Sequence, residues 1–193
     1  MANNCYVNIV FTHKTKEACD KHMDWLVSRK QEASRDKVRM FYGADERWLD
    51  DADIMRMSDV SLSLAGDVRW ALELWDFAGA VKAANPETLA SAHATYEECG
   101  NGVYGTYHYA DGKFCERMLP DEYWPEPEDE LSDEELDDWY DTEDERLEAA
   151  LSEHGVDGGP YTEEAVEEKY KAYVAWRESS RKTFNNSLKQ EEE

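Results

Sequence analysis

The feature that most constrains this chain is a block of acidic residues between positions 121 and 158. The block holds eighteen Asp and Glu residues and a single base, Arg146. The whole chain of 193 residues has a formal net charge of -24, so most of the excess negative charge lies in this one segment. Self-repulsion of this size opposes compaction, and it favours cationic partners over nucleic acid or anionic lipid. Another part of the chain must therefore hold the fold together, and the expected partners are basic.

The first 120 residues have an ordinary balance of nineteen acids and fourteen bases. Residues 5–11 are rich in β-branched and aromatic residues, and residues 58–64 alternate polar with apolar, so both segments are predicted strands. Further strands are expected at residues 38–42, 90–97, 102–108 and 114–117, and helices at residues 17–31 and 68–84. The order β-α-β-β-α-β plus a hairpin strand predicts an α+β fold of ferredoxin-like type, an antiparallel sheet with two helices on one face.

Three motifs in this region resemble a known family. They are Met1-Ala2-Asn3-x-Cys5, Trp70 at the start of the second predicted helix, and Tyr96-Glu97-Glu98-x-Gly100-x-Gly102-x-x-Gly105. On these motifs, residues 1–120 resemble the YubB-type ferredoxin-like domain of phage, plasmid and bacterial proteins. The chain lacks the proline usually found just after the tryptophan. The resemblance implies a ferredoxin-like fold and a mobile-element origin, and it transfers no catalytic residues. The acidic segment lies outside it and resembles phage DNA-mimic inhibitors.

Residues 121–193 are expected to form a second unit, an acidic linker followed by a helical hairpin. Pro120, Pro125 and Pro127 disfavour regular structure up to about residue 130. Ser132 and Glu135 have the spacing of a capping box, and an apolar stripe after them predicts a packed amphipathic helix. The stripe consists of Leu136, Trp139, Tyr140, Leu147, Ala150 and Leu151. Residues 155–160 predict a turn, and a final helix capped by Thr162 follows. The apolar faces of the two helices are expected to meet each other or the sheet.

The acidic helix carries charge at a density close to that of nucleic acid. Ten carboxylates lie between residues 133 and 148, roughly 22 Å of continuous helix at about 1.5 Å per residue. One charge per roughly 2 Å compares with one per about 1.7 Å along duplex DNA. Like charges four residues apart each cost about 0.2–0.5 kcal/mol, and a basic partner would offset that cost. The alternative is that the carboxylates are only solvated, as on many acidic helices.

These residues are the predicted partner-binding site, in which the carboxylates replace phosphates and pair with Lys and Arg of a partner. The site comprises Asp133, Glu134, Glu135, Asp137, Asp138, Asp141, Glu143, Asp144, Glu145, Glu148 and Trp139. Trp124 and Trp139 suit two roles equally, anchoring a partner or packing on the first domain.

No motif in the chain indicates catalysis, so no enzymatic activity and no cofactor are expected. Phosphate-loop, nucleophile-elbow, zinc-protease and EF-hand patterns are all missing. The four cysteines are widely spaced, which favours reduced, buried thiols. His93 and His108 could share the sheet with Glu97 and Cys99 in a metal site, but ordinary sheet histidines are the favoured interpretation and no metal is expected. The sequence has no membrane-spanning run and no export signal, so the cytoplasm of a host cell is expected.

Together these patterns predict a phage- or mobile-element-encoded inhibitor that mimics nucleic acid. Its expected target is the DNA- or RNA-binding channel of a host defence effector, such as a CRISPR surveillance complex, a nuclease or a restriction enzyme. The alternative is a non-enzymatic, chaperone-like module that holds a basic protein partner. A third hypothesis is RNA binding through sheet aromatics, namely Tyr104, Tyr107, Tyr109 and Phe114, with Lys113 and Arg117 as the nearby bases. Packing of these aromatics against the protein's own helices is favoured over that role.

Overall fold

The protein is built on one antiparallel sheet. The computed structural model describes residues 4–36, 40–42, 47–69, 72–98, 103–125, 127 and 131–191. The strands lie in the order β2-β3-β4-β1-β5-β6-β7-β8, and every pair of neighbours is antiparallel. They are β1 (Asn4–His13), β2 (Met40–Tyr42), β3 (Arg47–Arg56), β4 (Ser61–Arg69), β5 (Leu89–Glu98), β6 (Val103–Ala110), β7 (Lys113–Met118) and β8 (Val156–Tyr161). The predicted α+β class with an antiparallel sheet is confirmed, and the sheet is larger than predicted.

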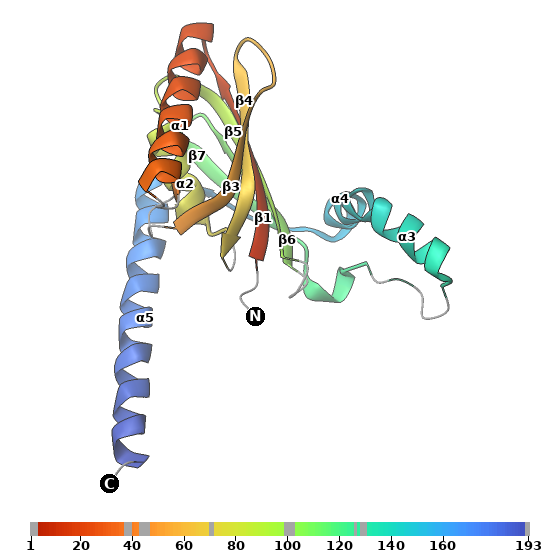
Figure 1. The fold of residues 1–193 in the computed structure, drawn as a ribbon. Coiled ribbons are helices and arrows are strands. Elements are labelled where there is room, and N and C mark those ends of the chain that lie inside the picture. The colour runs from red at the N-terminus through yellow and green to blue at the C-terminus, as the bar shows by residue number, and fades with distance from the viewer. Residues whose placement is uncertain are drawn as a thin grey trace.

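One face of the sheet carries the main core because the strands alternate. On β1, Val7, Ile9 and Phe11 are fully buried, whereas the alternating side chain of Tyr6 is 53% exposed. Two helices, α1 (Lys16–Asp36) and α2 (Leu74–Ala83), cover the apolar face. In Figure 1 they lie on one side of the sheet together with α5 (Glu163–Glu191). Burial of this apolar face is the main force that holds the fold together.

The second helix begins later than the sequence predicts. Residues 68–69 complete strand β4, residues 70–71, with Trp70, lie outside the described part of the chain, and α2 starts at Leu74. Glu73 and Asp76 form a capping box that fixes this start, because each side chain binds the backbone amide of the other. The apolar run from Val68 therefore divides between a strand and a helix.

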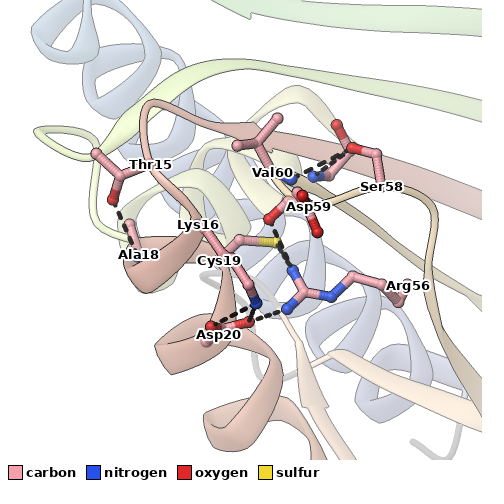
Figure 2. A network of polar contacts seen from close by, with 10 residues as sticks. Thr15, Lys16, Ala18, Cys19, Asp20, Arg56, Ser58, Asp59 and Val60 are labelled. Atoms are coloured by element: carbon pink, nitrogen blue, oxygen red, sulfur yellow. Dashed lines mark hydrogen bonds and ion pairs between the residues drawn. The ribbon is translucent and has the colours of Figure 1, made fainter.

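Strand β3 was not predicted, because its sequence lacks a clear alternation. It pairs with β4, and it is tied to α1 through Arg56. Arg56 donates one hydrogen bond to Cys19 Sγ (2.7 Å) and another to the Asp59 carbonyl (3.1 Å), and it also pairs with Asp20, as Figure 2 shows. The strand predicted at residues 38–42 is present as β2 at residues 40–42, and residues 38–39 lie outside the described part.

The predicted helical hairpin at the C-terminal end is wrong. Residues expected to form its turn are strand β8, which pairs with β7 at the edge of the sheet. Gly158 permits this pairing, since a Cβ there would lie 2.5 Å from the Glu116 carboxylate. Helix α5 begins after Thr162, whose hydroxyl accepts from the Ala165 amide as predicted, and it packs against α2 and β8. The acidic helices α3 (Asp133–Asp141) and α4 (Glu143–His154) lie across the sheet from α5 (Figure 1).

The domain boundary expected at residue 120 stays a prediction. Beyond it, β8 extends the sheet, and Val166 of α5 is buried in the main core. The segment after residue 120 therefore contributes to the same sheet and core as the segment before it.

Candidate acidic binding surface

The first acidic helix starts at a capping box, as the sequence predicts. The Ser132 hydroxyl accepts from the Glu135 amide (3.4 Å), and the Glu135 carboxylate accepts from the Ser132 amide (2.9 Å) and hydroxyl (2.6 Å). These hydrogen bonds to its charged form lower the pKa of Glu135. The cap orients the first turn of α3, and Glu135 serves that purpose in addition to contributing charge.

A break at Thr142 divides the helix that was expected to run through residues 133–148. The Thr142 hydroxyl donates to the carbonyls of Asp138 (3.1 Å) and Trp139 (3.2 Å), which competes with a continuous helix. As a result, Asp141 and Glu145 lie on different helices, and the four-residue spacing of a single helix no longer applies to them. Figure 1 shows α3 and α4 pointing in different directions. The carboxylates therefore form a bent surface and not a straight rod.

Most of the described carboxylates on these two helices are exposed. Those with exposed side chains are Glu134, Glu135, Asp138, Asp141, Asp144, Glu145 and Glu148, whereas Glu143 is half-buried. Asp133 and Asp137 lie on α3, but their side chains are outside the described part. Among the described side chains, no ion pair joins these carboxylates to a Lys, Arg or His of the chain. Their negative charge is therefore not neutralised within the described part of the protein.

Helix α4 attaches to the sheet through a small apolar cluster separate from the main core. Leu147 and Leu151 of α4 pack with Tyr104 of β6 and Leu119, and Trp124 and Ala150 cover the cluster. Leu147 has no exposed area. This cluster anchors the acidic helices to the face of the sheet opposite the main core.

The two aromatic residues of α3 occupy different positions. The side chain of Trp139, predicted to contact a partner, is only 8% exposed and meets Tyr140 edge-on, with ring centroids 5.3 Å apart. Its packing within the chain leaves little of the ring accessible to a partner. Tyr140 is 55% exposed beside the carboxylates. The apolar stripe in the sequence assigned both residues to the buried face, and the structure places only Trp139 there.

A carboxylate from the sheet joins the acidic surface. Burial raises the pKa of Glu143, and the nearby charges of Glu97 and Asp144 raise it further. Burial also raises the pKa of Tyr104 to about 12, and Glu148, Asp144 and Glu97 add to this effect. Glu97 on β5 therefore lies within the electrostatic reach of α4. Nothing in the sequence places Glu97 beside the acidic block, because it belongs to a strand far from that block in the chain.

The structure also shows the positions of the histidines, aromatic residues and cysteines that the sequence singled out. His93 and His108 are cross-strand partners with ring centroids 6.2 Å apart, and burial lowers the pKa of His93. In the described part of the chain, which excludes Cys99, no group of three or more His, Cys, Asp or Glu is arranged to hold a metal ion.

The aromatic residues considered for RNA binding, Tyr104, Tyr107, Tyr109 and Phe114, are all buried, so the favoured packing interpretation is confirmed. Cys5 and Cys19 are buried thiols that belong to no disulfide, as expected, whereas Cys115 is only half-buried.

Arg117 is also committed within the protein. Its guanidinium contacts α4 and Asp157 of β8, so it is not available to phosphates as the RNA-binding hypothesis requires.

Among the described helices, none has the length and apolar character needed to cross a membrane.

Comparisons of this chain with protein-family models, with curated proteins and with solved structures give no match.

Proposed function

We propose that this protein is a mobile-element-encoded inhibitor that binds the nucleic-acid channel of a host defence effector by imitating nucleic acid. The observation that supports it most directly is the row of exposed carboxylates on α3 and α4 that form no described ion pair. None of the described side chains neutralises these charges, although retaining them opposes helix stability. A basic channel evolved to bind phosphates would offset that repulsion.

The bend at Thr142 changes the shape of the proposed mimic but not its charge density. Within each helix the rise of about 1.5 Å per residue still gives a negative charge per unit of axial length similar to that of duplex DNA. Nucleic acid bound in protein channels is itself often bent. The expected contacts are therefore Lys and Arg side chains of a curved channel, with the exposed ring of Tyr140 as an aromatic contact beside them.

The sheet would act as the scaffold that presents these helices. We propose a ferredoxin-like core made of β3-β4-β1-β5 with α1 and α2, because this strand order and connectivity match the split β-α-β arrangement. The resemblance of residues 1–120 to the YubB-type domain supports the same fold and a phage or plasmid origin. In this proposal the protein acts in the cytoplasm of the host, without enzymatic activity, cofactor or metal.

The test begins by capturing the target from bacteria that carry defence systems and identifying it by mass spectrometry. Displacement of labelled DNA or RNA from that target is then measured with wild-type protein and with two charge-reversal variants. The first variant changes Glu134, Asp138, Asp141, Asp144 and Glu145 to Lys. The matched control makes the same change in net charge at five exposed acids elsewhere, Glu17, Asp24, Glu87, Glu168 and Glu178.

Wild-type protein and the control are expected to displace the nucleic acid, with an affinity that falls steeply as salt is added. The five-site variant on α3 and α4 is expected to lose displacement completely. If that variant displaced nucleic acid as well as the control does, the mimic proposal would be overturned.

A second candidate is a non-enzymatic, chaperone-like module that holds a basic protein. The exposed Tyr140 beside the carboxylates favours it, because aromatic residues are common at protein interfaces. The same competition experiment separates the two functions. A holder would bind its partner while leaving a separate nucleic-acid site open, whereas a mimic excludes nucleic acid from the target.

A further inference from the structure

In addition to the apolar cluster, Arg117 of β7 makes polar contacts with the last turn of α4. Its guanidinium donates to the carbonyls of Leu151 (Nε, 2.9 Å) and Ser152 (Nη2, 3.0 Å), and it pairs with Asp157 of β8 (Nη1, 3.0 Å). The Leu151 carbonyl also accepts from the Gly155 amide (2.9 Å). Carbonyls at a helix C-terminus carry partial negative charge, so a cation bound there is favourable. Arg117 therefore joins β7, α4 and β8 at a single point.

Gly155 allows this close approach between α4 and β7. A Cβ at Gly155 would lie 2.3 Å from the Leu151 carbonyl oxygen and 2.5 Å from Arg117 Nε. Any side chain there would displace either the helix end or the guanidinium. The absence of a side chain at Gly155 therefore leaves room for the contact between Arg117 and the end of α4.

The bend between the two helices is held by Arg146, the single base of the acidic block. Its Nε donates to the Thr142 hydroxyl (3.3 Å), and its guanidinium lies over the Trp139 ring, 5.5 Å from the centroid. Arg146 thus links the first turn of α4 to the buried aromatic residue of α3. This contact is more exposed than the one made by Arg117, so we expect it to contribute less.

We propose that Arg117 and Arg146 are positioning residues that fix the acidic helices in one arrangement, so that the carboxylates are presented as a preformed surface. Arg117 sets how α4 lies on the sheet, and Arg146 sets how α3 continues from α4. The consequence for affinity rests on the proposed function, because a preformed surface loses less conformational entropy when it binds a rigid partner. The consequence for helix mobility does not depend on it.

When either arginine is replaced with Gln, a positioning role and simple electrostatics predict opposite changes in affinity for a rigid basic partner. Replacing either arginine with Gln makes the protein more negative, which by itself strengthens attraction to any cationic partner. A positioning role predicts weaker binding to a rigid partner despite that added attraction. Whether the affinity for a rigid partner falls or rises therefore distinguishes a positioning role from a purely electrostatic effect.

The experiment compares Arg117→Gln, Arg117→Lys and Arg146→Gln with the control Lys113→Gln, which removes the same charge at the other end of β7. Amide hydrogen exchange measured by mass spectrometry reports mobility in residues 143–154, with β1 and β5 as an internal reference. Binding is measured to a flexible oligolysine peptide, and to the rigid basic target captured as described above.

In Arg117→Gln, amides near the end of α4 are expected to exchange at least about tenfold faster, because hydrogen bonds to a charged group are lost. Exchange in β1 and β5 should stay as in wild type, and Arg117→Lys should fall between the two, since Lys retains charge but not the forked geometry. Arg146→Gln should accelerate exchange in α3 by a smaller factor. Lys113→Gln should match wild type.

Oligolysine should bind the Arg117→Gln and Arg146→Gln variants as well as or better than wild type, and the rigid target should bind them more weakly. Wild-type exchange in α4 of Arg117→Gln would overturn the positioning role, and so would tighter binding of that variant to the rigid target. If instead β1 and β5 also lost protection in that variant but not in Arg117→Lys, Arg117 would be a residue of the global fold, which also overturns the proposal. Failure to find any basic target would count against the proposed function alone, because the exchange results stand without it.

Discussion

The sheet with α1 and α2 and the acidic unit of α3 and α4 are stabilised in different ways. The sheet region buries a continuous core that includes Ile9, Phe11 and Phe77. The acidic unit is attached through a cluster of four buried residues and through Arg117. Charge follows the same division, since Asp20 of α1 pairs with Lys16 and Arg56, whereas the exposed carboxylates of α3 and α4 from Glu134 to Glu148 form no described ion pair. The difference shows that the chain keeps the residues that stabilise the fold apart from those that present charge.

The largest expected effect comes from truncating the main core. Phe77 has no exposed area, stacks on Tyr107 with centroids 5.7 Å apart and meets Phe114 edge-on. Phe77→Ala should lower the free energy of unfolding by about 3–5 kcal/mol, because it removes apolar contacts and leaves a cavity. Chemical denaturation followed by Trp fluorescence measures this change. A loss below 1 kcal/mol would mean that the main core does not hold the fold.

Truncation of the second cluster should act locally. Leu147→Ala is expected to weaken the attachment of α4 by about 2–4 kcal/mol, seen as faster amide exchange in α3 and α4. Exchange in β1, β4 and β5 should change little. Tyr140→Ala is the matched control, since this exposed ring should alter stability by less than about 0.5 kcal/mol. Equal loss of protection in the sheet would show that the two regions unfold as one unit.

Acid should destabilise the sheet region through a buried histidine pair. His13 Nε2 and His22 Nδ1 lie 3.0 Å apart, and burial, with the charge of His13, lowers the pKa of His22 to about 4. Burial likewise lowers the pKa of His13. Because an unfolded His binds a proton near pH 6.5, stability present above that value is lost as the pH falls toward 4, by roughly 3 kcal/mol. Thermal unfolding of wild type and His22→Asn across this range measures it, and an equally steep dependence in both would exclude the pair as the cause.

The acidic unit should respond to pH in the opposite direction. The pKa of Glu143 is raised by burial and by neighbouring carboxylates, so its protonation favours the folded arrangement and that contribution is lost as the pH rises through this pKa. In the same acid titration, amide exchange in α4 should therefore slow relative to exchange in β1. Glu143→Gln should remove part of this difference. If amide exchange accelerated equally in α4 and β1 as the pH falls, the predicted difference between the acidic unit and the sheet would be wrong.

Much of the sheet region could be predicted from local patterns. β-Branched and aromatic runs located β1, and alternation located β4 and β5, because a half-buried strand imposes a period of two residues. The Ser132 cap and the Thr162 cap were also predictable, since each involves residues only a few positions apart. Strand β3 and the true start of α2 were not, because their sequences lack a clear period and neighbouring elements fix their limits.

The sequence by itself determined the α+β class, the antiparallel sheet and the concentration of negative charge in α3 and α4. Only the tertiary structure decided that residues 156–161 form an edge strand, that Glu97 joins the acidic surface and that Arg117 binds the end of α4. Periodicity, caps and composition act between neighbours in the chain and can be read directly. Strand partners and the contacts of a long arginine side chain join residues tens of positions apart, so they become defined only when the whole core packs.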